Sequence, residues 1–330
     1  MIPEEGGTTT VLAREQLEKH QISIYAGALV LGVGLGLANP AVNSVLESLI
    51  SPIIALLLYS MFTQIPFLQR KEAFASPRFL IALLLSNFVL VPIVVWAILQ
   101  CFPALSVPVL TGICLVLLAP CIDYVIMFTQ MGRGNVVYIL TATPVLFIIQ
   151  IVLLPVYLYL FLGEQMSGLV QLGPFIEAFV YLIVIPCLLA VLLQAWARRS
   201  QNGVRGIAIS AWLPVPFMAL TLFVVAASQL PKLKGDLHLI LQILPIYMLF
   251  HVLMPICSSL IARCFRLESG AGRALLFSSS TRNSLVVLPL ALALPGEWGT
   301  IAAAVIVTQT MVELVAELIY IRAIPWMIKD

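Results

Sequence analysis

The sequence predicts an all-α membrane protein of about ten transmembrane helices. Of its 330 residues, 62% are hydrophobic and only 10% are charged, the apolar residues form long runs, and lysine and arginine gather between those runs. Soluble domains average about 45–50% apolar and about 25% charged residues. A water-soluble fold has too little interior to hold this much apolar surface, so we expect the lipid bilayer to be the solvent and the principal partner.

Ten stretches are long and apolar enough to cross a membrane, which takes roughly 20 residues as a helix. Lipid offers no hydrogen-bond partner to an open backbone, so each stretch is expected to be helical. Numbered from first to tenth, these spans are residues 21–39, 48–66, 79–101, 108–131, 135–162, 174–197, 207–228, 237–262, 273–295 and 299–323.

The cations between the spans predict the orientation, because cytoplasmic loops are enriched in lysine and arginine. With a cytoplasmic N-terminus, 14 cations lie on the inner side, while Lys232 and Lys234 lie outside and Arg282 lies within a span. Both termini are therefore expected in the cytoplasm, on a multi-pass protein of the cell (inner or plasma) membrane. The polar segment 1–20 lacks an apolar core and is predicted to be a cytoplasmic tail rather than a cleaved signal peptide.

The chain is also predicted to consist of two halves, residues 21–165 and 166–330, with five spans each. Thr63-Gln64-Ile65-Pro66 closes the second span, and Ser228-Gln229-Leu230-Pro231 closes the seventh span 165 positions later. An odd number of spans inserts the second half with the opposite orientation. Such inverted repeats are typical of secondary transporters, in which the substrate site lies near the midplane.

Composition and motifs exclude several other classes of function. The net charge of +2 is too small to suggest a nucleic-acid partner, and the six cysteines contain no CxxC pair that would suggest a disulfide framework. Walker A, HExxH and GxSxG strings are absent from the sequence, which argues against an ATP motor, a metalloprotease and a serine hydrolase. We therefore predict no catalytic residue, no cofactor and no resident metal, and leave the oligomeric state open.

The fourth span contains a proline and a carboxylate at membrane depth. Asp123 lies about 15 residues into the span, roughly 22 Å deep, and polar groups at such depth are functional candidates because they are costly. Pro120 lacks an N–H, so the helix is expected to kink or break there. We interpret the segment as a discontinuous helix whose freed backbone groups and Cys121 line a binding site. The alternative is an ordinary proline kink with Asp123 facing a water-filled crevice.

The ninth span contains the matching interruption. Seven consecutive polar residues, Ser278 to Ser284, separate two apolar segments, and Arg282 lies roughly 14 Å into the span. Hydroxyl runs are also tolerated as helix-packing surfaces, but that reading does not explain an arginine at this depth. Asp123 and Arg282 are therefore candidates to neutralise one another across the interface of the two halves.

The tenth span adds a second candidate partner for Arg282. Glu313 and Glu317 are four residues apart and share a helical face, with Gln309 one turn before them. We expect Glu313 to lie near the site, and we interpret Glu317, which is nearer the cytoplasmic end, as solvated.

Three segments resemble the bile acid:sodium symporter superfamily and, within it, the arsenite permeases of the arsenical-resistance group. They are Leu118–Tyr124 (LAPCIDY), Gly132–Asn135 (GRGN) and Thr281–Pro295 (TRNSLVVLPLALALP). The resemblance covers all ten spans in number and order. It implies a panel domain formed by the first, second, sixth and seventh spans, and a core domain formed by the others, in which the fourth and ninth helices unwind where they cross.

The resemblance carries over only in part. Cys121 matches the cysteine that is thought to bind the metalloid in the permeases, but Leu285 stands where their ninth span has a carboxylate. At the positions of the sodium ligands of the sodium-coupled branch, this chain has Val125, Ile126, Ser278 and Arg282. A fixed guanidinium would repel sodium, so we expect transport that does not depend on sodium.

The leading hypothesis is a proton-coupled secondary transporter that exports a small oxyanion or metalloid such as arsenite or antimonite. The predicted substrate-binding residues are Cys121, Asp123, Ser280, Thr281, Arg282 and Asn283, and the predicted coupling residues are Asp123, Gln309 and Glu313. The alternative is an organic-anion symporter of the bile-acid type, in which Arg282 pairs with a substrate carboxylate. A sensor or intramembrane enzyme is a third class, for which the sequence offers no reacting nucleophile.

Overall fold

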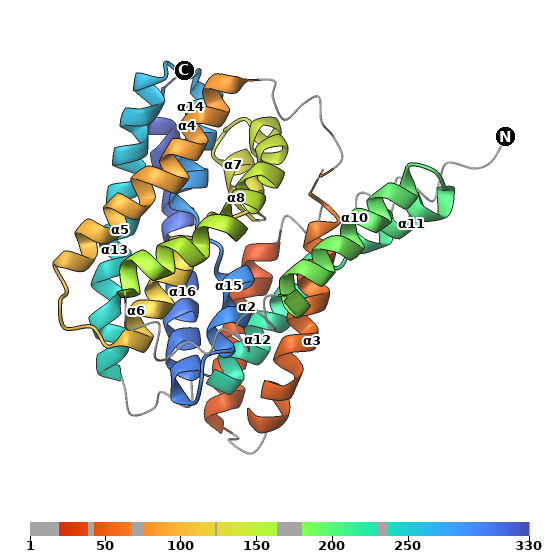
Figure 1. The fold of residues 1–330 in the computed structure, drawn as a ribbon, viewed down its shortest axis with the longest axis vertical. Coiled ribbons are helices and arrows are strands. Elements are labelled where there is room, and N and C mark those ends of the chain that lie inside the picture. Colours follow the sequence, from red (N-terminus) through yellow and green to blue (C-terminus); the bar gives the residue numbers. More distant parts are fainter. Residues whose placement is uncertain are drawn as a thin grey trace. The chain divides into compact units, whose positions relative to one another are not determined.

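The computed structural model describes residues 20–38, 43–65, 67, 76–122, 124–163, 180–229 and 237–329. All regular elements in these ranges are helices. The only β-type backbone bridge among the described residues is an isolated one, between Pro120 and Arg282. The helices form two compact units, residues 1–64 with 180–234 (unit 1) and residues 65–179 with 235–330 (unit 2), each described here by itself. Figure 1 gives the order of the helices along the chain.

Unit 1 contains the elements around the predicted first, second, sixth and seventh spans. They are α2 (Gln21–Ala38), α3 (Asn43–Phe62), the π-helical turn η4 (Val180–Val184), α10 (Ile185–Ala197), α11 (Gln201–Ser210) and α12 (Pro214–Gln229). Helix α12 packs on both α2 and α3. At the end of α3, the side-chain amide of Gln194 donates to the carbonyl oxygens of Phe62 and Thr63 at 3.3 and 3.2 Å, which satisfies groups that a helix terminus leaves open.

Unit 2 contains the remaining elements. They are α4 (Pro77–Leu85), the π-helical turn η2 (Ser86–Leu90), α5 (Val91–Gln100), α6 (Val107–Leu117), α7 (Val125–Met131), α8 (Val136–Leu162), α13 (Leu237–Cys264), α14 (Ser269–Ser280), α15 (Ser284–Leu292) and α16 (Glu297–Met327). Helix α16 packs against α6, α13 and α15, so the tenth predicted span lies beside both interrupted spans.

A proline explains the π-helical turn in the third predicted span. Pro92 has no N–H for the carbonyl of Phe88, four residues before it. The hydroxyl of Tyr157 on α8 donates to that carbonyl at 2.6 Å instead. The turn widens the helix at Ser86–Leu90 and leaves Asn87, one of its residues, fully buried. Single π turns of this kind are frequent at functional sites.

The surface of the helices is that of a membrane protein. Five of the described helical segments are long and apolar enough to cross a bilayer: 77–100, 136–162, 201–228, 239–264 and 297–327. Segments 23–38, 48–62, 107–117 and 185–197 are apolar but shorter. On α13, the exposed residues Val252, Ile256 and Leu260 recur every four positions and form an apolar stripe along one side of the helix. The chain is therefore a multi-pass membrane protein.

Several predicted boundaries differ from the observed helices. The seventh span was expected to begin at 207, but a helix already begins at Gln201 and is interrupted by a turn at 211–213 before α12. The tenth was expected to end at 323, whereas α16 runs to Met327. Residues 174–179 of the sixth span lie outside the described residues, so the count of ten spans and the two inverted halves stay predictions.

Candidate functional site

The fourth predicted span is interrupted at its proline. Helix α6 ends at Leu117 and α7 begins at Val125, eight residues later. Leu118 to Ile122 are non-helical and buried, and Pro120 lies in the middle of this segment. The interruption expected from Pro120 is thus present. Asp123, which the sequence places at the centre of the site, lies outside the described residues.

The ninth predicted span is interrupted within its polar run. Helix α14 ends at Ser280, α15 begins at Ser284, and the three residues between them are non-helical and buried. The side chain of Asn283 caps α15 by accepting the amide of Val286 at 3.2 Å. A short polar side chain competes well for such an open amide, which explains why the helix restarts at this residue.

The two interruptions meet and join through their backbones. The amide of Cys121 donates to the carbonyl of Thr281 at 3.2 Å, and the amide of Asn283 donates to the carbonyl of Ala119 at 2.8 Å. Together they form an antiparallel bridge between Pro120 and Arg282. Each broken helix therefore supplies hydrogen-bond partners that the other has lost. We call residues 118–122 and 281–283 the crossing.

Two glycines allow the helices to approach one another around the crossing. A Cβ at Gly132, after α7, would lie 2.2 Å from the ring of Phe277 on α14. A Cβ at Gly112 on α6 would lie 2.9 Å from the side chain of Val305 on α16. Small residues at such contacts are typical of helix packing in membranes, where close approach supplies the attraction.

The side chain of Arg282 is fully buried at the crossing. One terminal nitrogen of its guanidinium donates to Asn87 Oδ1 and to the carbonyl of Ser278, both at 2.8 Å, and the other donates to the carbonyl of Leu117 at 3.4 Å. Its central carbon lies 5.7 Å from the centre of the Phe250 ring, within cation–π range. The charge therefore lies at the C-terminal ends of α6 and α14, where the helix dipoles favour a cation.

Of the two partners proposed for Arg282 from the sequence, Asp123 lies outside the described residues and its pairing stays a prediction, while the contact of Glu313 differs from the one expected. Among the described residues no carboxylate lies within 4.0 Å of its guanidinium. Glu313 does contact Arg282, but it accepts the main-chain amide, at 2.8 Å, rather than the side chain. A carboxylate that binds a main-chain amide fixes the shape of the interruption, which is a different role from neutralising the guanidinium.

Glu313 is held by donors from three elements. Besides the amide of Arg282, its carboxyl group contacts the hydroxyl of Tyr124 at 2.6 Å and the side-chain amide of Gln309 at 2.5 Å. The hydroxyl of Tyr124 also lies 3.0 Å from the carbonyl oxygen of Arg282. Glu313 thus ties α16 to both interrupted spans at once, as its position one turn after Gln309 led us to expect for a residue near the site.

Glu317 is buried rather than solvated, so the interpretation from its position in the sequence is wrong. Its side chain has no exposed surface, and its Oε1 lies 2.6 Å from the hydroxyl of Thr281. Distance from the end of the span does not determine burial here. Glu317 lies on the side of α16 that faces the end of α14, where the hydroxyl of Thr281 contacts it.

Most of the predicted site residues in the described part of the chain come together here. Cys121, Ser280, Thr281, Arg282 and Asn283 are all buried at or beside the crossing, and Gln309 and Glu313 face it from α16. Among the described residues, six side-chain atoms in this region are buried without a hydrogen-bond partner. They are Ser280 Oγ, Arg282 Nε, Asn283 Nδ2, Ser284 Oγ, Gln309 Oε1 and Glu317 Oε2. Buried polar atoms are rarely left unpaired, so this cluster is suited to receive a polar ligand.

Sequence reasoning missed two residues of the site. Asn87 orients its oxygen toward Arg282 by donating to Leu83 O and Ser278 Oγ at 3.1 and 3.3 Å. It lies in the middle of an apolar span, so the depth rule that identified Arg282 could have found it as well. Tyr124 belongs to a quoted motif, but its contact with Glu313 joins residues 189 positions apart and left no signal in the sequence.

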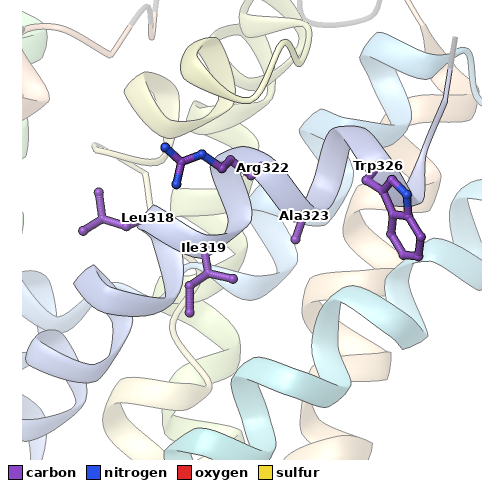
Figure 2. Close-up of a pocket in the computed structure, with 5 residues that line it drawn as sticks. All are labelled: Leu318, Ile319, Arg322, Ala323 and Trp326. Atoms are coloured by element: carbon purple, nitrogen blue, oxygen red, sulfur yellow. The ribbon is translucent and has the colours of Figure 1, made fainter.

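A shallow hollow on the outer surface of α16 is separate from the crossing. Figure 2 shows the side chains that line it, Leu318, Ile319, Arg322, Ala323 and Trp326. Arginine and tryptophan beside aliphatic residues are typical of the level where a membrane meets water. None of the lining residues belongs to the crossing, so we do not assign the site to this hollow.

The chemistry of the crossing does not indicate a metal centre. Among the described residues no group of three histidine, cysteine, aspartate or glutamate side chains could hold a metal ion. Cys121 and Cys114 are buried thiols and take part in no disulfide. What the arrangement offers is a fixed cation, open hydrogen-bond donors and two buried carboxyl groups.

Comparison with known proteins identifies the family. Residues 51–236, more than half of the chain, match the family model described as Sodium Bile acid symporter family. A comparison with curated proteins gives no match. The matched segment includes α6, the crossing residues of the fourth span and α7, and the fold around it is that of a multi-pass membrane protein. The chain therefore belongs to the sodium bile acid symporter family and is a secondary transporter of a small substrate, not an enzyme.

Proposed function

We propose that the protein transports a small oxyanion or metalloid of the arsenite type through the crossing, and that protons drive the transport. The observation that carries the proposal is the fully buried guanidinium of Arg282, which has no carboxylate partner among the described residues. A charge at such depth costs roughly 2.5–3.5 kcal/mol on insertion scales, so its retention favours a functional role.

The open donors around Arg282 favour a substrate that is rich in oxygen. Arg282 Nε, Asn283 Nδ2 and Ser284 Oγ are buried and have no hydrogen-bond partner among the described residues. Hydrogen bonds from charged or buried donors to an oxyanion are the stronger ones in a low dielectric. Because these donors belong to the interruption of the ninth span, movement of either half-helix would change how the substrate is held.

Cys121 adds a preference for a soft element. Its main chain is bonded to Thr281 at the crossing, and its side chain is fully buried. Thiolates favour soft acceptors, and trivalent arsenic is one of them. The thiol of Cys121 lies one residue from Pro120, beside a set of hydrogen-bond donors. This combination favours arsenite as the substrate over an organic anion whose only polar group is a carboxylate. The alternative, an organic-anion symporter, would use the same guanidinium but would leave the thiol without a role.

The contacts of Arg282 support the absence of sodium coupling. Three oxygens, Asn87 Oδ1 and the carbonyls of Ser278 and Leu117, lie around the guanidinium. Hard cations need such sets of oxygens, and here a tethered cation uses them. Protons are then the proposed source of energy, with Asp123, Gln309 and Glu313 as the proposed coupling residues.

The proposal includes the architecture and orientation expected from the sequence. The two interruptions fall in the fourth and ninth spans, the counterparts in two halves, 21–165 and 166–330, of opposite orientation. The excess of cations on one side supports cytoplasmic termini in the cell membrane.

Arsenite sensitivity tests the proposed substrate. A host that lacks its own arsenite exporter should regain resistance when it expresses the wild-type protein, but not when it expresses Cys121→Ser or Arg282→Gln at equal levels in the membrane. Cys264→Ser, at the exposed end of α13, is the matched control and should protect like wild type. Full protection by Cys121→Ser would contradict metalloid binding by the thiol. Uptake of a bile acid by a protein that gives no arsenite resistance would establish the alternative.

A further inference from the structure

Four buried residues form a stripe along α16 that faces the crossing. Gln309, Glu313, Glu317 and Tyr320 recur every three or four positions and are buried, whereas Val315 and Ile319, on the other side of the helix, are each 61% exposed. The two carboxyl groups are thus one turn apart, inside the protein. Two carboxylates cannot both ionise easily at such a distance in a low dielectric, so the pair is expected to share protons unequally.

The donors around the two carboxyl groups are unequal. Glu313 Oε2 accepts two N–H groups, from the main chain of Arg282 and from the side chain of Gln309, and the main-chain donor cannot turn away without breaking the structure of the crossing. In the part of the chain that the structure describes, Glu317 has no N–H donor, and its Oε2 is buried without a partner. Hydrogen bonds to a carboxylate stabilise its charged form. The negative charge therefore belongs on Glu313 and the proton on Glu317.

The hydrogen-bond partner of the Thr281 hydroxyl depends on whether Glu317 carries a proton. Thr281 Oγ1 lies 2.6 Å from the carbonyl oxygen of Phe277 and 2.6 Å from Glu317 Oε1, but a hydroxyl has only one proton to donate. Both contacts are hydrogen bonds only if Glu317 is protonated and donates to Thr281. When Glu317 loses its proton, the hydroxyl must turn to the carboxylate. Phe277 O then keeps only its bond from the amide of Thr281, at 3.0 Å.

We propose that Glu317 takes up and releases the coupling proton, and that Thr281 transmits this change to the interruption of the ninth span. Thr281 is the C-cap of α14, directly after its last residue Ser280, and its carbonyl accepts the amide of Cys121 in the fourth span. A proton at Glu317 thus alters a hydrogen bond at the junction of both broken helices. This assignment rests on the proposed proton coupling and adds to it a residue that the sequence analysis left outside the site.

The groups around Glu317 are compatible with this role. Helices α7 and α15 carry no titratable side chain. On α13, His251 has Nδ1 3.2 Å from the hydroxyl of Tyr320 and a buried Nε2 without a partner. Among the described residues, the titratable and charged groups beside the two carboxyl groups are Cys121, Tyr124, His251 and Arg282 on packed segments and Tyr320 on α16 itself.

The test uses Glu317→Gln in the full-length protein, because an amide can donate to Thr281 but cannot release a proton. Infrared difference spectra between neutral and alkaline buffer, over which exposed carboxyl groups stay ionised, should show the carbonyl band of a protonated carboxylic acid in the wild type. The band should be absent from Glu317→Gln and unchanged in Glu297→Gln, an exposed glutamate on the same helix. A wild type without the band, or a band that persists in Glu317→Gln, would overturn the assignment.

Flux in proteoliposomes separates this inference from the proposed substrate. With arsenite as the probe, an imposed pH gradient should drive net flux in the wild type and in Glu297→Gln but not in Glu317→Gln, which should still exchange arsenite for arsenite. An unchanged response to the pH gradient in Glu317→Gln would contradict the coupling role. If the wild type carries no arsenite while the infrared band behaves as expected, the substrate is wrong and the assignment of the proton stands.

Discussion

At the scale of single residues, the crossing depends on how a buried guanidinium is satisfied. Arg282 draws on main-chain carbonyls at the ends of α6 and α14 and on one side chain, Asn87. The carbonyls are available because both helices stop there. The side-chain amide nitrogen of Asn87 donates to Leu83 O and Ser278 Oγ. These bonds fix the orientation of its oxygen, which accepts from Arg282. Hydrogen bonds to charged groups contribute about 1.5–3 kcal/mol each.

Asn87→Ala should therefore lower the free energy of unfolding by about 1.5–3 kcal/mol, because it removes the only side-chain acceptor of the guanidinium among the described residues. Thermal unfolding of the purified protein in detergent measures the change. Asn202→Ala, at an exposed position of α11, is the matched control and should melt like wild type. Equal melting of Asn87→Ala and wild type would show that Asn87 does not hold Arg282.

The sequence predicted the charged and reactive residues of the site better than their partners. Arg282, Glu313 and Cys121 stand out because polar groups deep in a span are costly, and that cost can be counted from one residue. Partnerships depend on which side chains the fold brings together. Asn87 and Arg282 are 195 positions apart, and no local pattern relates them. Glu317 was misjudged because burial by neighbouring helices does not follow depth in the membrane.

At the scale of elements, the interruptions could be predicted and their bridging could not. A proline removes a backbone donor wherever it occurs in a span, and a run of seven polar residues cannot remain against lipid. The bridge between Pro120 and Arg282 requires the two gaps to meet in register. The early start of α11 at Gln201 was also missed, because its first turns alternate polar and apolar residues and have little mean hydropathy.

Two glycines of α2 offer a matched test of helix packing in unit 1. A Cβ at Gly32 would lie 2.4 Å from the carbonyl oxygen of Phe223 on α12, whereas a Cβ at Gly34 would meet nothing within 4 Å. Gly32→Ala must push the two backbones apart and should destabilise the protein by about 1–3 kcal/mol, as overpacking does. Gly34→Ala should be neutral or slightly stabilising, since alanine favours helix. Equal melting temperatures of the two variants would contradict the close approach of α2 and α12.

At the scale of the whole molecule, the distribution of lysine and arginine predicts that both termini lie in the cytoplasm, and cysteine labelling tests this orientation. Fourteen lysines and arginines lie on the side expected to be cytoplasmic, against two on the other. A cysteine introduced as Glu4→Cys should react with a membrane-impermeant maleimide only after the cells are opened. The same cysteine introduced as Lys232→Cys, in an outer segment, should react in intact cells. Labelling of position 4 from outside would reverse the proposed orientation.

The central claim for the whole molecule is a transport site built around a tethered cation and driven by protons. Net arsenite flux into proteoliposomes, measured with either a pH gradient or a sodium gradient imposed, tests it most directly. We expect the flux to rise with the pH gradient and to be the same with and without sodium, because the guanidinium of Arg282 uses the oxygens that a bound cation would need. Flux that scales with the sodium gradient at constant pH would contradict the account.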